Sequence, residues 1–176
     1  LFWQSNEGNQ MVGSTAHPTR IHYARDYAYA GTIPHNFINA QNFRYSSSDG
    51  KWAVAWIQDM DGDLATAADQ EVYRMTYDGV WGSPQRLTNN DQQEHFLTMG
   101  SDAEGNFYLF WEMDNAVVVQ MPSGRETLFA EDPAVQVSGL MLCRSLHSLD
   151  LLVLAREEEK RTAYMIRESA SAWTPP

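Results

Sequence analysis

The sequence predicts an all-β protein built from repeated four-stranded antiparallel units, and two recurring markers support this prediction. An apolar segment that ends in tryptophan recurs about every 54 residues, at Trp3, Trp56 and Trp111. A tyrosine followed eleven residues later by a proline recurs in the same order, as Tyr23/Pro34, Tyr73/Pro84 and Tyr164/Pro175. Four short strands in each unit, with a period near fifty residues, are typical of the blades of a β-propeller-like array.

The order of apolar and polar residues places the strands within a unit. Residues 52–56, 71–77 and 81–88 are expected to form three strands of one small antiparallel sheet. Phe107–Trp111 is continuously apolar, as expected for a strand that is buried on both faces. Glu71–Tyr77 alternates between apolar and polar residues, which predicts a half-buried strand. No window of helical length keeps an apolar stripe, so we expect no helix.

The repeat divides the chain into residues 1–39, 41–88, 92–130 and 135–176. The first range supplies three strands of a blade and the others supply whole blades, which gives about 3.75 blades. Both ends of the sequence fall inside a blade, which favours part of a larger ring over a closed ring of four blades. We therefore expect the remaining blades of a longer chain, or a protein partner, to cover the ends of this array.

Composition excludes some classes of function. The chain has 176 residues and a formal net charge of -11, with 23 acidic residues against 12 Lys and Arg. This balance argues against a nucleic-acid partner and allows cation binding or a basic partner. No apolar run approaches the length of a transmembrane segment, so none is expected. The one cysteine, Cys143, rules out an internal disulfide, and its apolar neighbours predict a buried thiol.

The sequence resembles the repeats of secreted bacterial β-propellers, the sialidase-like and Asp-box-related modules of large exported proteins. The segments that carry the resemblance are 77–88 and 102–111. The Asp-box pattern Ser-x-Asp-x-Gly-x-Thr-Trp is matched in part by Ser48-Asp49-Gly50 and by Ser101-Asp102-Ala-Glu-Gly105. The resemblance implies an extracellular, cell-surface or periplasmic location, and a fold whose members range from glycosidases to adhesins and scaffolds.

The strongest chemical signal in the sequence is an acidic segment between the second and third strands of the 41–88 unit. Carboxylates at alternate positions of a Gly-containing loop can surround a calcium ion, which takes six to eight oxygen ligands. The alternative is a solvated loop in which Asp and Gly only form turns. The predicted metal ligands are Asp59, Asp61, Asp63, Asp69 and Glu71. In a propeller this loop shares one face with the connections between blades, so we expect an acidic loop face.

Catalytic residues are not recognisable in the sequence. The five histidines are scattered without metal-ligand spacing, and no Gly-x-Ser-x-Gly motif occurs. Tyr27, Tyr29, His35 and Phe37 are candidates for stacking on a glycan or anchoring a protein, or for packing between blades. The sequence therefore favours a non-enzymatic binding or scaffold module with a possible calcium site. The alternative is a fragment of a sialidase-like glycoside-processing propeller enzyme.

Overall fold

Fifteen β-strands and no helix form the described part of this computed structural model, which covers residues 1–6, 12–26, 28–63, 65–66, 68–130, 135–144, 148–157, 160–169 and 172–174. The strands are β1 (Phe2–Ser5), β2 (Arg20–Arg25), β3 (Ala28–Thr32), β4 (Ala40–Ser48), β5 (Lys51–Asp59), β6 (Gln70–Tyr77), β7 (Gln85–Arg86), β8 (Glu94–Ser101), β9 (Phe107–Met113), β10 (Ala116–Met121), β11 (Gly124–Ala130), β12 (Val135–Arg144), β13 (Leu149–Glu157), β14 (Lys160–Ser169) and β15 (Ala172–Thr174). The described residues accordingly contain no helix that would traverse a bilayer.

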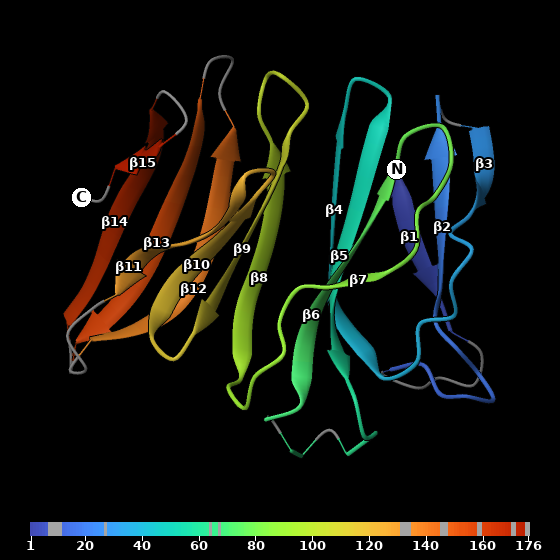
Figure 1. Cartoon of the computed structure of the whole chain (residues 1–176), viewed down its shortest axis with the longest axis horizontal. Coiled ribbons are helices and arrows are strands. Elements are labelled where there is room, and N and C mark those ends of the chain that lie inside the picture. Colours follow the sequence, from blue (N-terminus) through green and yellow to red (C-terminus); the bar gives the residue numbers. More distant parts are fainter. Residues whose placement is uncertain are drawn as a thin grey trace.

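The strands pair into four antiparallel sheets, each made of strands that follow one another in the chain. The first sheet holds β1–β3, the second β4–β7, the third β8–β11 and the fourth β12–β15. Figure 1 shows the sheets side by side in chain order, with the N-terminal sheet at one end and the C-terminal sheet at the other. The predicted all-β, propeller-like array of blades is confirmed, with three strands in the first sheet and four in each of the others.

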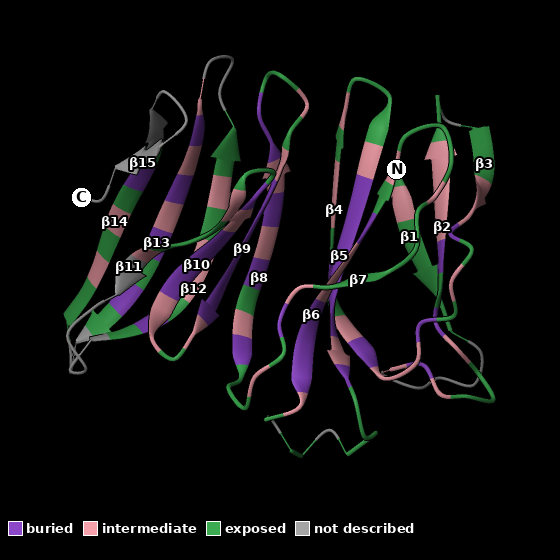
Figure 2. Ribbon diagram, viewed as in Figure 1, coloured by how far each residue is buried: buried purple, intermediate pink, exposed green. Residues whose placement is uncertain are grey.

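Each pair of neighbouring sheets encloses its own apolar core, as the buried bands of Figure 2 indicate. Phe37, Val54 and Trp56 lie in the core between the first two sheets. Ala55 and Ile57, from the other face of β5, lie in the core between the second and third sheets. Successive side chains of a strand point to opposite faces, so the apolar β5 contributes to two cores.

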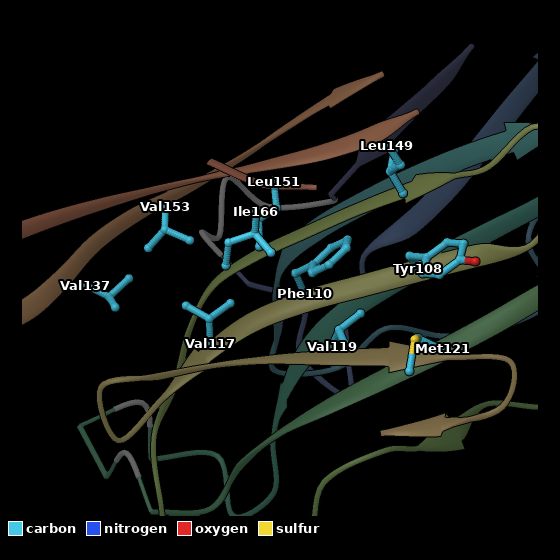
Figure 3. Close-up of a cluster of buried hydrophobic side chains, with 10 residues drawn as sticks. All are labelled: Tyr108, Phe110, Val117, Val119, Met121, Val137, Leu149, Leu151, Val153 and Ile166. Carbon is cyan, nitrogen blue, oxygen red and sulfur yellow. The ribbon is translucent and has the colours of Figure 1, made fainter. Parts of the chain in front are cut away.

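Strand β9 connects the second and third cores in the same way. Leu109 and Trp111 face the second sheet, and Tyr108 and Phe110 face the fourth. Figure 3 shows Phe110 among side chains of the fourth sheet, with Leu151 nearby. The prediction that residues 107–111 are buried on both faces is confirmed, because only Phe107 of this range is partly exposed.

The thiol of Cys143 is exposed, so the prediction that it is buried was wrong. The cause is the alternation of β12. Leu140 and Leu142 pack on the core between the third and fourth sheets, which turns Met141 and Cys143 to the opposite face of the fourth sheet. An apolar run in the sequence therefore does not bury every member when only one face of the strand is covered.

Candidate metal centre

The candidate centre lies in the loop that joins β5 to β6. Asp59 is the last residue of β5 and pairs with Gln70, the first residue of β6, so the two strands hold both ends of the loop in register. In Figure 1 this loop lies at the opposite end of the second sheet from the β4–β5 turn at Asp49 and Gly50. The described residues that lead into β2 lie on the same side of the array as the β5–β6 loop.

Three of the five predicted ligands lie together in the structure. One carboxylate oxygen from each of Asp59, Asp61 and Asp69 lies within 4.8 Å of the other two. The loop holds them by short bonds: the Gly62 amide donates to Asp59 Oδ1 at 2.6 Å, and the Asp61 amide donates to Asp69 Oδ2 at 3.0 Å. Gly62 has a φ of +87°, which an L side chain rarely adopts, so the turn that brings its amide to Asp59 favours glycine here.

Asp59 is the electrostatically unusual member of this cluster. Its side chain is only 1% exposed, and its Oδ2 atom has no hydrogen-bond partner. Burial raises the pKa of Asp59 above its ordinary value, opposed by the bond from Gly62 and reinforced by the charges of Asp69 and Asp61. In the described part of the chain, none of the three clustered carboxylates pairs with a Lys or Arg.

The other two predicted ligands are placed differently. The Asp63 carboxylate accepts a hydrogen bond from the Ala65 amide at 3.1 Å and is not one of the clustered groups. Glu71 accepts a bond from Arg86 Nη2 at 2.6 Å and another from the Asn90 amide at 3.1 Å. Because Gln70 is opposite Asp59 in the β5–β6 ladder, Glu71 points to the other face of the sheet.

A second group of buried acids, which the sequence pattern did not reveal, lies between the second and third sheets. Glu94, at the start of β8, is 1% exposed and accepts a bond from Asn90 Nδ2 at 3.0 Å. Burial raises the pKa of Glu94, and the charge of Glu71 adds to this effect. Each of these two glutamates keeps one buried oxygen without a partner. The sequence around Glu94 does not indicate that its side chain is buried, because this burial depends on how two sheets pack.

These buried acids give the stability of the chain an expected dependence on pH. The pKa values of Asp59, Glu94 and Glu112 are raised mainly by burial, so the folded state binds more protons than the unfolded state just above the ordinary carboxyl range. These carboxyl groups contribute fully to the free energy of unfolding when the pH is below the ordinary carboxyl pKa. That contribution is lost as the pH rises through their raised pKa values. In EDTA, the free energy of unfolding is therefore expected to decrease from about pH 5 towards neutral pH.

Urea unfolding across this range measures the effect, and Glu94→Gln tests its source. This variant keeps a hydrogen-bonding side chain and removes one of the raised carboxyl groups, so its stability should vary less with pH than that of the wild type. A wild-type stability that increases towards neutral pH, or the same slope in the variant, would contradict the assignment.

The candidate aromatic residues do not form one surface. Tyr29 is 65% exposed on the first sheet, beside Trp3 at a ring-centroid distance of 6.1 Å. His35 and Phe37 instead pack on Trp56, with centroid distances of 5.6 and 4.9 Å. Tyr27 lies outside the described residues.

Comparison with known proteins gives no family for this chain. No family model matches it, and no curated protein does. Among solved structures, it is similar to the xylan beta-1,4-xylosidase from Bacillus halodurans C-125, with 15% sequence identity and a TM-score of 0.47. That similarity covers 90% of this chain and 37% of the xylosidase chain. At this identity and TM-score, the similarity carries nothing about activity over to this chain.

Proposed function

We propose that this chain is a non-enzymatic binding or scaffold module of an exported protein, and that a calcium ion organises its acidic loop face. The ion would be held by Asp59, Asp61 and Asp69, with remaining positions filled by loop carbonyls or water. The unpartnered and buried Oδ2 of Asp59, next to two further carboxylates, is the observation that carries this proposal. An unpaired buried charge costs several kcal/mol in the folded state, and a bound cation would offset that cost.

The geometry of the cluster supports calcium as the ion. Calcium binds oxygen at about 2.3–2.6 Å, so two ligands of one ion are at most about 5 Å apart. The three carboxylate oxygens lie within 4.8 Å of one another, which is within this span. The donor set contains oxygen only, which suits a hard cation and disfavours metals that prefer nitrogen or sulfur.

Calorimetric titration with calcium tests the proposal directly. The wild-type chain is expected to bind one calcium ion, and Asp61→Asn should weaken binding at least about tenfold, since one charged ligand is lost. Asp49→Asn is the matched control: it removes the same charge from the turn at the opposite end of the sheet, where asparagine tolerates the φ of +49°. Equal calcium affinity in the wild type and Asp61→Asn, or no calcium binding by the wild type, would contradict the proposed calcium site.

A further inference from the structure

A cavity of 280 Å³ lies where the third sheet meets the fourth, near the starts of β8 and β12 and the end of β9. All the residues that line it belong to the described part of the chain, and none is a lysine or an arginine. They are His95, Phe96, Glu112, Asn115, Gln136 and Val137. The cavity wall therefore combines one phenyl ring with a carboxyl group, two amides and an imidazole, and it shares no residue with the acidic cluster of the β5–β6 loop.

The polar groups of this wall are open to a ligand. Within the described residues, the ring nitrogens of His95 and the side-chain amides of Asn115 and Gln136 form no hydrogen bond. Glu112 is largely buried, but only its Oε1 atom has a partner, the Asn115 backbone amide at 2.6 Å. Its Oε2 atom is unpaired and is not a buried atom, so a ligand in the cavity can reach it. Four side chains thus offer unused hydrogen-bonding capacity to one small space.

Glu112 occupies a position that is apolar in the neighbouring sheet. It follows the repeated tryptophan of β9, as Ile57 follows the one of β5. Ile57 is fully buried in the core between the second and third sheets. Burial raises the pKa of Glu112, opposed by the bond from Asn115 and by the charge of His95. A carboxyl group that replaces a core residue and lines a cavity indicates a functional site more than a packing role.

Phe96 supplies an aromatic ring in a conformation that is unfavourable for the fold alone. It is 39% exposed, and its φ of +52° is in the left-handed region, which a bulky side chain rarely adopts. Phe96 lies in the β-bulge of β8. The corresponding bulge of β4 holds Asn42 at a φ of +55°, and asparagine tolerates this conformation. Strained residues of this kind are concentrated at functional sites, which supports a ligand-binding role for the exposed ring.

The mixture of groups in the wall favours one kind of ligand. An anion only accepts hydrogen bonds and would face the Glu112 carboxyl, whereas an ammonium only donates and would leave the N–H groups of the amides unused. A hydroxyl both donates and accepts, so a polyhydroxylated molecule can use the carboxyl, the amides and the imidazole together. A pyranose ring also has an apolar C–H face that can pack against a phenyl ring. The volume of the cavity is at the small end of ligand sites, which fits a single ring.

We propose that this cavity binds one neutral pyranose unit of a glycan, with its apolar face on Phe96 and its hydroxyl groups at Glu112 and Asn115. The Gln136 amide and the His95 ring border the same space and would bond further hydroxyl groups. This inference goes beyond the proposed calcium site and uses none of its residues. Either proposal can therefore fail without the other.

The test is an NMR titration of the isotope-labelled chain with the methyl glycosides of glucose, galactose, mannose and xylose, followed at the side-chain amides of Asn115 and Gln136. At least one glycoside is expected to give saturable shifts with a Kd on the order of 10 mM, since a single ring makes few contacts. Sodium acetate and methylammonium chloride are the ionic controls and should give none. Saturable shifts with an ion and with no glycoside, or no saturable shift with any of these probes, would overturn the inference.

Phe96→Asn separates ligand binding from a structural role. Asparagine is the residue of the corresponding bulge in β4 and relieves the strain at positive φ, so the midpoint of thermal unfolding should rise by about 2–4 °C. The same change removes the aromatic ring and should weaken glycoside binding about fivefold. A more stable variant that binds less well is the result expected of a residue kept for its ligand.

Asn115→Gly removes one amide from the wall without straining the turn, because the φ of +60° at this position suits glycine. It should weaken glycoside binding about fivefold, since one hydrogen bond to the ligand is lost. Asn42→Gly is the matched control, because it makes the same change at a positive φ in the second sheet and should bind as the wild type does. Wild-type glycoside affinity in either Phe96→Asn or Asn115→Gly would overturn the inference, whereas calcium binding should be unchanged in all three variants.

Discussion

Asp59→Asn is expected to raise the free energy of unfolding by about 2 kcal/mol at neutral pH in EDTA. The substitution removes a buried charge that has an unpartnered oxygen and two neighbouring carboxylates. Asparagine keeps the acceptor for the Gly62 amide, so the hydrogen bond that shapes the turn is retained. A change that removes a native charged group would thus stabilise the fold, which is unusual among point mutations.

Calcium should reverse the order of the two proteins. At a calcium concentration of 100 times its Kd, the wild type is expected to gain about 2.7 kcal/mol from binding, whereas Asp59→Asn should gain little. Urea unfolding of both proteins in EDTA and in calcium measures the four free energies. The matched control Asp49→Asn, on the opposite face, should behave as the wild type in both conditions. If Asp59→Asn is less stable than the wild type in EDTA, the buried Asp59 carboxylate does not destabilise the folded state.

Phe110→Ala should have the largest destabilising effect, about 3–5 kcal/mol. Phe110 is fully buried between the third and fourth sheets, so its loss leaves a cavity in a core that two blades share. Val80→Ala is the surface control, because Val80 is 75% exposed in the β6–β7 turn and should change stability by less than about 0.5 kcal/mol. Urea unfolding monitors both variants, and a Phe110→Ala effect below about 1 kcal/mol would show that the sheets do not depend on this core.

Much of the fold was predictable because it follows from local patterns. The continuous apolar run at Phe107–Trp111 predicts burial on two faces, and β9 has it. The repeat of Trp56 and Trp111 places both residues at equivalent positions of neighbouring sheets, where each is fully buried. The exposure of Cys143 could not be predicted, since it depends on which face of β12 packs on the third sheet: Leu140 and Leu142 face that core, and Cys143 lies on the other face.

The sequence was enough to predict which acidic residues form the candidate site, but not where each of their side chains would point. Loop spacing was enough to select Asp59, Asp61 and Asp69, which the structure brings together. It also selected Glu71, whose placement depends on the strand register: with Gln70 opposite Asp59, the next side chain turns towards Arg86.

A thermal melt of the chain in EDTA and in saturating calcium tests the central claim most directly. Binding to the folded state alone raises the midpoint, and a gain of about 2.7 kcal/mol corresponds to several degrees for a chain of this size. The account predicts such a rise in the wild type and in Asp49→Asn, and a rise at most about half as large in Asp61→Asn, whose calcium affinity is at least about tenfold lower. A cooperative melt with the same midpoint in EDTA and calcium would contradict it, and would leave the Asp59 cluster as an acidic loop without a metal.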